Sequence, residues 1–409
     1  MAKNGRDAAG VLSDISTDAK NKALEAIAAT LLTNTARIIK ANQKDLAAGK
    51  KSRLAGAMLD RLKLDEKRIN AMARSVREII DLPDPVGELM EEWERPNGLK
   101  IRKVRVPIGL IGIIFESRPN VTVDAAVLCL KSGNACILRG GKEALESNKC
   151  LAACLQEGLK NAGLPETAIQ LVGKTDRALV DELLAQDQYI DLIIPRGGKG
   201  LIERVSSKSR IPVIKHYDGI CHTYVDPSAD MDMAVQVCFN AKVQRPGVCN
   251  AMETLLVHQD AAVAFLPEMA ARLREAGVEI RGCEKTRTII SDAAPATEED
   301  WSTEYLGMIL SVRVVDSLQE AVRHITKYGS RHSDAIIASD PDIISLFSRK
   351  VDSSAVFVNC SERFNDGFEF GFGAEIGIST EKLHARGPMG LRELCSYKYI
   401  VTGNGQIRT

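Results

Sequence analysis

The sequence predicts an α/β protein built on parallel sheets. Short apolar, β-branched runs alternate with segments of helical periodicity over most of the chain. Within the runs the residues are almost continuously apolar, as expected of strands that are covered on both faces. The chain has 409 residues, of which 45% are hydrophobic. At roughly 150 residues per domain, this length predicts two or three domains.

The N-terminal region predicts helices. Residues 5–50 have helical character, with Ala and Leu recurring at helical spacing through Ala23–Leu32, and amphipathic helices continue over 54–80. Two prolines in the segment 81–85 end this region. The apolar and β-branched segment 103–115 then predicts strands.

Two sets of alternating elements follow. In the first set, strands are predicted at 135–140, 168–172, 190–195 and 211–216, and helices at 145–162, 175–186 and 199–207. In the second set, strands are predicted at 252–258, 309–315, 335–339 and 355–358, and helices at 231–242 and 262–276. A domain change is expected between 216 and 226, and a last strand at 396–403. Sheets of this kind bind ligands at the carboxyl ends of their strands.

Composition excludes several classes of function. Basic and acidic residues balance at 54 each, which argues against a nucleic-acid-binding protein. No apolar run approaches the roughly 20 residues of a membrane helix, and the first residues lack a signal peptide, so a cytoplasmic protein is expected. Ten cysteines are scattered without a CxxC pair or a paired-histidine motif. They predict free thiols in a reducing compartment and no metal site.

One cysteine lies in a pattern that fits catalysis. Cys249 follows the Pro246-Gly247 break and precedes an apolar strand, so its thiol can lie at a domain surface. Lys242 and Arg245 are nearby cations that could favour the thiolate. A single cysteine is more often an inert small hydrophobic residue, and this pattern alone leaves both interpretations open.

Six stretches together carry a resemblance to a known family. They are VPIGLIGIIFESRPNVTVDAA (106–126), LRGGKEALESN (138–148), IPRGGKGLI (194–202), KHYDGICHTYVD (215–226), KVQRPGVCNAMETLLVH (242–258) and FEFGFGAEIGISTEKLHARGPMGLRELCSYKYIVTGNGQIR (368–408). The chain resembles the aldehyde dehydrogenase superfamily, and within it the branch that reduces an acyl phosphate of glutamate. The resemblance extends from Val106 to the end of the sequence.

The resemblance implies an aldehyde-dehydrogenase-like fold. Two doubly wound α/β domains and an oligomerisation strand segment are expected. An NADP-binding domain would take residues 1–220 with a contribution from about 366–386, a catalytic cysteine domain would take 221–365, and an oligomerisation tail would take 387–409. Relatives pair through such strands, so a homodimer or homotetramer is expected.

The implied activity is the NADPH-dependent reduction of L-glutamyl 5-phosphate to L-glutamate 5-semialdehyde and phosphate, the second step of proline biosynthesis from glutamate. Cys249 would form the thioester. Asn120 in ESRPN matches the family's oxyanion-binding asparagine, and the backbone N–H of Cys249 would be the second donor. The alternative for Asn120 is a turn residue after Pro119. A glutamate 5-kinase partner that supplies the acyl phosphate is also possible.

Cofactor binding is expected without the usual glycine fingerprint. No GxGxxG follows a strand, but Gly197 and Gly198 lie between a strand and a helix, where backbone N–H groups can bind a pyrophosphate. An ordinary turn would also favour glycine there. In the family alignment, Arg139 and Lys142 fall where NAD-dependent members carry a ribose-binding lysine and glutamate. Two cations there favour the 2′-phosphate of NADP. Glu304 in TEYLG resembles the glutamate that holds the nicotinamide ribose.

Substrate recognition is less sharply defined. The phosphate and carboxylate require cations, and the amine requires acceptors. The candidate cations are Arg118, Arg245 and Arg386, and the candidate acceptors are Glu116, Asp366 and Glu375. Each of these residues could equally belong to a surface ion pair.

His216 marks a departure from the hydrolytic aldehyde dehydrogenases. Those enzymes carry a water-activating glutamate where this chain has His216. The loss fits a reductase that must not hydrolyse its thioester, and a role of His216 in proton transfer is left open. Two alternatives remain, namely an NAD(P)-dependent aldehyde oxidase of the same superfamily and a non-catalytic protein that keeps the fold.

Overall fold

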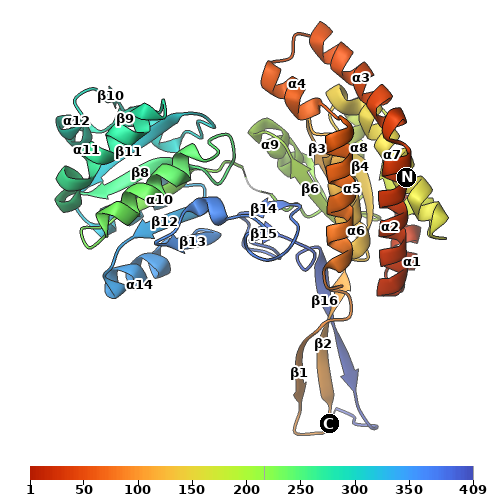
Figure 1. The fold of residues 1–409 in the computed structure, drawn as a ribbon. Helices are drawn as coiled ribbons and strands as arrows, with labels where there is room; N and C mark the ends of the chain where they lie inside the picture. The colour runs from red at the N-terminus through yellow and green to blue at the C-terminus, as the bar shows by residue number, and fades with distance from the viewer. Residues whose placement is uncertain (216, 409) are drawn as a thin grey trace. The chain divides into compact units, whose positions relative to one another are not determined.

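The computed structural model describes residues 1–215 and 217–408, which form two compact units (Figure 1). Unit 1 consists of Met1–Lys215, Gly371–Gly377 and Met389–Thr409. Unit 2 consists of His216–Phe370 and Ile378–Pro388. Positions 216 and 409 fall within these ranges but are not among the described residues. Within the segment 366–386, which was predicted to join the first domain, only 371–377 belong to unit 1.

Unit 1 begins with five helices, in the region that was predicted to be helical. They are α1 (Ala2–Leu12), α2 (Thr17–Thr33), α3 (Thr35–Lys51), α4 (Gly56–Leu62) and α5 (Glu66–Asp81). The Ser16 side chain caps α2 by accepting a hydrogen bond from the N–H of Ala19. Asp65 caps α5 in the same way from Arg68. These caps satisfy backbone donors that a helix leaves unpaired at its first turn.

A four-stranded parallel sheet lies at the centre of unit 1. Its order is β5 (Ile169–Leu171), β4 (Ala135–Arg139), β3 (Leu110–Phe115) and β6 (Leu192–Arg196). The connections contain α6 (Val121–Lys131), η1 (Lys142–Ala144), α7 (Leu145–Asn161), η2 (Glu166–Ala168) and α8 (Ala178–Leu184), and α9 (Lys199–Lys208) follows β6. The chain runs outward from β3 to β5 and then returns to β6 on the other side of β3. Such a reversal of strand order is where doubly wound sheets bind ligands.

The strand predicted at 211–216 is wrong over its described residues. Only a single bridge joins Val213 to Ile193 of β6. Backbone bonds connect Ile193 N–H to Pro212 O and Ile214 N–H to Ile193 O. Pro212 has no N–H, so an extended hydrogen-bond ladder cannot continue through it. Residue 216 lies outside the described residues.

Unit 1 also contains a three-stranded antiparallel sheet (Figure 1). Its order is β1 (Leu89–Glu94), β2 (Lys100–Pro107) and β16 (Cys395–Thr402). The predicted final strand is therefore confirmed as β16. Strand β1 was not predicted, since half of its sequence LMEEWE is charged and all of it is exposed.

Unit 2 is built on a seven-stranded parallel sheet. Its order is β10 (Ala294–Pro295), β9 (Glu279–Gly282), β11 (Ile309–Val315), β8 (Met252–His258), β7 (Cys221–Val225), β12 (Ser333–Ile337) and β13 (Ala355–Val358). The helical segments are α10 (Met231–Val243), α11 (Gln259–Glu275), α12 (Glu284–Ile289), η3 (Asp300–Ser302), α13 (Leu318–Tyr328), α14 (Pro341–Lys350) and η4 (Glu362–Phe364). The parallel arrangement confirms the predicted fold class.

Two apolar cores cover the two faces of this sheet. Val225 and Leu255 pack into the core that includes α10 and α11. Their neighbours Tyr224 and Leu256 pack into the core that includes α13 and α14. Successive side chains of a strand point to opposite faces, so helices on both faces produce the nearly continuous apolar runs seen in the sequence.

Two short strands near the end of the chain, β14 (Gly377–Ser379) and β15 (Gly387–Met389), pair with each other. Among residues 1–215 and 217–408, none of the helices has both the length and the apolar character that crossing a membrane requires.

Candidate active site

Cys249 lies on the loop that joins α10 to β8 in unit 2. α10 ends at Val243, and a turn through Pro246 and Gly247 carries the chain to Cys249, as the Pro-Gly break predicts. The residue is partly exposed, whereas seven of the ten cysteines are buried. The loop therefore gives this thiol access to solvent and to a ligand.

The backbone of Cys249 packs tightly against the start of β7. A Cβ added to Gly219 would lie only 2.0 Å from the Cys249 carbonyl oxygen and 2.5 Å from its Cα. The thiol of Cys221 donates a hydrogen bond to the same carbonyl over 3.1 Å. Burial raises the pKa of Cys221 well above its ordinary value, so this thiol keeps its proton and remains a donor. Glycine at 219 is needed for this close approach.

Glu304 fixes the segment that supports the cysteine. Its carboxylate Oε1 accepts a hydrogen bond from the N–H of Gly219 over 2.9 Å. The contact links the loop after η3 to the backbone that packs behind Cys249. Binding of a cofactor ribose by Glu304 remains a prediction.

A buried ion pair stabilises the base of the cysteine loop. Lys242 Nζ at the end of α10 lies 2.5 Å from Glu253 Oε2 on β8, and both side chains are fully buried. Glu253 Oε1 also accepts from the N–H of Leu306 over 3.1 Å. Burial lowers the pKa of Lys242 and raises that of Glu253 to about 7, while each partner opposes the shift of the other. Lys242, which was considered as a cation for the thiol, thus has its charge matched by Glu253.

Two arginines provide positive charge at the cysteine instead. Arg245 is exposed on the loop itself. Arg363 of η4 donates from Nε to the Gln244 side-chain oxygen over 2.9 Å. Burial and then the charge of Arg245 lower the pKa of Arg363, whereas the charge of Cys249 raises it. Arg363 therefore interacts electrostatically with both Arg245 and the nucleophile.

In unit 1, Asn120 immediately precedes α6 at the end of the β3–α6 loop. Its Nδ2 donates to Asp124 Oδ2 over 2.8 Å. Burial raises the pKa of Asp124 to about 6, although the Asn120 bond and the Arg196 charge lower it. An amide nitrogen carries two N–H groups, of which the bond to Asp124 occupies one and orients the other.

The glycine loop lies at the carboxyl end of β6. Gly198 caps α9 in extended conformation, and its N–H donates to Glu116 Oε2 over 3.0 Å. A Cβ at Gly197 would come within 2.4 Å of the same carboxylate oxygen. The loop thus already binds an anionic group, as expected of N–H groups at a helix N-terminus. Whether it binds a pyrophosphate remains a prediction.

The two predicted NADP cations lie at and just after the carboxyl end of β4. Arg139 ends the strand and donates to the carbonyls of Gly140 and Thr175 over 3.1 and 3.3 Å. Its Nε is buried without a hydrogen-bond partner among residues 1–215 and 217–408. Lys142 begins η1 and is exposed. These donors fit the chemistry of a phosphate ester.

Three further predicted residues have the following places. Arg118 is exposed on the loop after β3 in unit 1. Arg386 in unit 2 donates from Nη2 to both the carbonyl and the carboxylate of Asp352 over 2.9 Å. His216 lies outside the described residues. Among residues 1–215 and 217–408, no group of three or more potential ligands is arranged to hold a metal.

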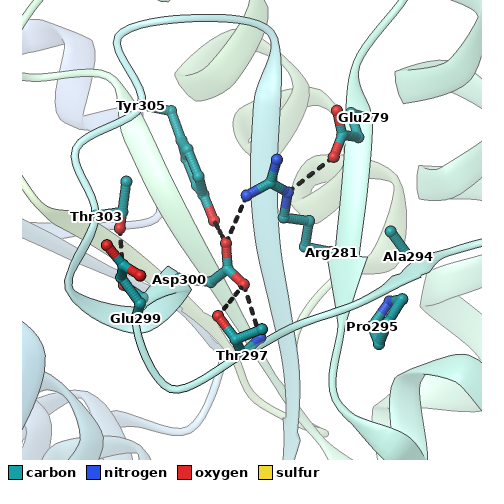
Figure 2. Close-up of a pocket in the computed structure, with 9 residues that line it drawn as sticks. All are labelled: Glu279, Arg281, Ala294, Pro295, Thr297, Glu299, Asp300, Thr303 and Tyr305. Carbon is teal, nitrogen blue, oxygen red and sulfur yellow. Dashed lines mark hydrogen bonds and ion pairs between the residues drawn. The ribbon is translucent and has the colours of Figure 1, made fainter.

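A cavity of about 520 Å³ opens elsewhere in unit 2, beside the segment that carries Glu304 (Figure 2). It is lined by Glu279, Arg281, Ala294, Pro295, Thr297, Glu299, Asp300, Thr303 and Tyr305. Arg281 is paired with Glu279 and Asp300, and the Tyr305 hydroxyl donates to Asp300 (Figure 2). Arg281 is the one cation among the nine lining residues and is already paired with carboxylates, and none of the predicted site residues lines the cavity. The cavity therefore does not belong to the proposed chemistry.

Sequence reasoning missed Gly219, Cys221 and Arg363. Gly219 and Cys221 were part of a quoted motif, but no local pattern relates them to Cys249. Arg363 is 119 positions from its partner Gln244, so only the fold brings the two together. The bond from Asn120 to Asp124 spans four positions at the start of a helix, and that spacing could have been found from the sequence.

Comparisons with known proteins agree with this architecture. The model of the aldehyde dehydrogenase family matches residues 18–294. A γ-glutamyl phosphate reductase of Moorella thermoacetica is 56% identical over 406 residues, covering 99% of this chain and 97% of the relative. One from Carboxydothermus hydrogenoformans is 56% identical over 408 residues, covering 100% and 98%.

A solved structure extends the likeness to the fold. The crystal structure of γ-glutamyl phosphate reductase from Thermotoga maritima matches with a TM-score of 0.98 and 48% identity, covering 100% of this chain and 99% of that one. The predicted resemblance and fold are thereby confirmed. The chain belongs to the γ-glutamyl phosphate reductases of the aldehyde dehydrogenase family.

Proposed function

We propose that the chain catalyses the NADPH-dependent reduction of L-glutamyl 5-phosphate to L-glutamate 5-semialdehyde and phosphate, the second step of proline biosynthesis from glutamate. The observation that carries this function is Cys249, a partly exposed thiol on a loop held against Gly219 and Cys221. Relatives named for this reduction match over almost the full length of the chain.

In the first step, the Cys249 thiolate attacks the 5-acyl carbon of the substrate. An S–C bond forms, the C–O bond to the phosphate breaks, and phosphate leaves with the electron pair and takes up a proton. The carbonyl oxygen becomes negative during the attack and requires fixed donors. We assign these donors to the Asn120 amide, oriented by Asp124, and to the Cys249 backbone N–H.

The second step converts the thioester to the aldehyde. Bound NADPH supplies the hydride that reduces the acyl carbon. Arg139 and Lys142 would hold the 2′-phosphate, because they present cationic donors after β4. Gly197 and Gly198 would hold the pyrophosphate, and Glu304 the nicotinamide ribose. When the S–C bond breaks, the sulfur leaves as a thiolate and the semialdehyde is released.

The remaining assignments follow the same reaction. Cofactor binding is assigned mainly to residues 1–220 with part of 366–386, and the cysteine chemistry to 221–365. Arg118, Arg245 and Arg386 are the proposed cations for the phosphate and carboxylate of the substrate. Arg386 would have to share its guanidinium with Asp352.

We assign the assembly to the C-terminal strand segment 387–409. Strand β16 exposes Tyr397, Tyr399 and Val401, and β16 is an edge strand of its sheet. An exposed apolar edge favours pairing into a homodimer or homotetramer. The ten free cysteines fit a reducing cytoplasm. A glutamate 5-kinase partner would supply the acyl phosphate.

The reaction run backwards tests the proposal. NADP reduction is followed with L-glutamate 5-semialdehyde, with and without phosphate, in the native chain and in Cys249→Ala. We expect turnover that requires phosphate and that the variant loses. Phosphate-independent turnover would indicate an aldehyde oxidase, and full activity of the variant would contradict the cysteine mechanism.

A further inference from the structure

The turn that contains η4 is attached to both ends of the cysteine loop. At one end, Gln244 accepts from Nε of Arg363 over 2.9 Å. At the other end, Asn250 Nδ2 donates to the carbonyls of Arg363 and Asn365 over 3.3 and 3.0 Å. Residues on either side of Cys249 thus contact the same arginine, through its side chain and through its backbone. The position of Arg363 is therefore fixed relative to the nucleophile.

The backbone around Arg363 is itself anchored in unit 2. The Ser361 hydroxyl accepts from the N–H of Arg363 over 3.3 Å. The neighbouring Glu362 is fully buried, and its two oxygens accept from the Thr223 hydroxyl of β7 over 2.9 and 3.1 Å. Burial of a carboxylate is unfavourable, and it raises the pKa of Glu362 to about 7. This energetically unfavourable buried carboxylate lies directly before Arg363 in the chain.

No carboxylate of the described residues forms an ion pair with Arg363. Among residues 1–215 and 217–408, none lies within the 4.0 Å of an ion pair, and the Nη1 of Arg363 is buried without a hydrogen-bond partner. The carboxylate of Asp366 acts on this charge from farther away, and the charge of Arg245 repels it. Two guanidinium groups held together next to a nucleophile, one with an unused buried N–H, form a favourable environment for a multiply charged anion.

We propose that Arg363, together with Arg245, binds the phosphoryl group of the acyl phosphate and the phosphate that leaves it. This inference rests on the proposed function. The phosphoryl group is bonded through one oxygen to the carbon that Cys249 attacks, whereas the carbon of the α-carboxylate is separated from that carbon by four C–C bonds. Arg363, whose charge interacts with Cys249, and Arg245 on the cysteine loop are therefore placed for the phosphoryl group.

The arrangement gives Arg363 a catalytic role. As sulfur attacks and the C–O bond breaks, negative charge grows on the departing phosphate, and a guanidinium can pair with two of its oxygens. In the reverse direction the same groups would hold phosphate while its oxygen attacks the thioester carbon and the Cys249 sulfur leaves. Gln244 acts as a positioning residue, because it touches Arg363 and directs its guanidinium.

The reverse reaction separates the two anionic groups of the substrate. Phosphate and L-glutamate 5-semialdehyde are varied in turn for the native chain, Arg363→Gln, Arg363→Lys and the exposed control Arg349→Gln on α14. Loss of a charge-assisted hydrogen bond to phosphate should raise the phosphate KM of Arg363→Gln about 10- to 100-fold. The semialdehyde KM should change less than about threefold on the same scale, Arg363→Lys should be intermediate, and Arg349→Gln should match the native chain.

A second readout does not depend on turnover, and its first arm uses the native chain alone. Inorganic phosphate should slow the alkylation of Cys249 by iodoacetamide in the native chain, and should fail to do so in Arg363→Gln. An increase in the semialdehyde KM alone, an unchanged phosphate KM, or no protection by phosphate in the native chain would overturn the inference. Turnover of the native chain without phosphate would instead remove the proposed function, and the inference with it.

Discussion

The surroundings of Cys249 in unit 2 and the proposed cofactor residues of unit 1 are built in different ways. Around Cys249, the supporting groups are buried and bonded to one another, as with Lys242 and Glu253. Around the glycine loop, Lys142 is exposed, and the N–H of Gly198 donates to the side chain of an exposed residue, Glu116.

The difference reflects what each group must do. A nucleophile displaced by about 1 Å loses on the order of a hundredfold in rate, so its position must be fixed by packing and buried bonds. A cation that pairs with a phosphate ester acts over a longer range and needs freedom to adjust. Substitutions near Cys249 should therefore affect stability and kcat, whereas substitutions of the cofactor cations should affect cofactor binding only.

The largest effect is expected at the buried ion pair. Lys242→Met leaves Glu253 buried without its cation, which should lower the free energy of unfolding by about 3–5 kcal/mol. The folded-state pKa of Glu253 is already raised, and it should rise further without Lys242. The Glu253 carboxyl contributes to stability below its unfolded-state pKa, and this contribution is lost as the pH rises through the raised folded-state pKa. The free energy of unfolding of the variant should therefore be lower at pH 8 than at pH 5. Urea unfolding at both values measures this.

The matched control for this prediction is the double variant Lys242→Met/Glu253→Leu. Replacing both charges by apolar side chains should restore most of the stability and remove the added pH dependence. A single variant as stable as the native chain at pH 8 would show that the pair does not support the loop.

The next largest effect is expected at Asn120. Asn120→Ala removes the proposed oxyanion donor and should reduce kcat about 10²- to 10³-fold. The free energy of unfolding should fall by only about 1–3 kcal/mol, because the variant removes the hydrogen bond to the Asp124 carboxyl but no side-chain cap of α6. Steady-state kinetics and thermal melts measure the two effects. If only KM changed, Asn120 would stabilise the ground state and the transition state equally. That result would argue against oxyanion binding by Asn120.

Gly219 should show how closely the cysteine backbone is held. Gly219→Ala places a methyl group against the Cys249 carbonyl and should reduce kcat about a hundredfold by displacing the nucleophile. Gly10→Ala in α1 is the control, since a Cβ there meets nothing within 4 Å. It should stabilise the helix by about 0.5–1 kcal/mol without altering kcat. Equal activity of both variants would mean that the loop tolerates the displacement.

The smallest effect is expected at Lys142. Lys142→Glu should repel a 2′-phosphate and shift the preference from NADP toward NAD about 10- to 100-fold in kcat/KM, with no change in unfolding. Lys44→Glu on α3 is exposed as well and should leave the preference unchanged. An unaltered cofactor ratio in Lys142→Glu would show that this cation does not contact the 2′-phosphate.

Much of the fold was predictable because both sheets are covered on both faces. Apolar runs such as 252–258 were therefore visible as strands, and the helices at 231–242 and 262–276 were predicted between them. Helices α12, α13 and α14 were not predicted. Strand β7 was missed, since its buried His222 and Thr223 interrupt the apolar run. Those polar residues are tolerated because Asp334 and Glu362 accept hydrogen bonds from them, which no local pattern reveals.

The candidate site was predictable only in part. The Pro-Gly break before Cys249 indicated a loop, and the structure has one there. The contacts that fix this loop come from Gly219, Glu304 and Arg363, which are distant in sequence. Their roles depend on how strands and turns meet in space, and one sequence carries little information about such long-range contacts.

The central claim is that the Cys249 sulfur carries the glutamyl group, and acyl-enzyme trapping tests it most directly. The native chain is incubated with L-glutamate 5-semialdehyde and NADP without phosphate, quenched in acid, digested and analysed by mass spectrometry. We expect a glutamyl adduct on the peptide that contains Cys249, which disappears when phosphate is added before quenching. NADPH formation without an adduct on that peptide, or an adduct on another cysteine, would contradict the mechanism.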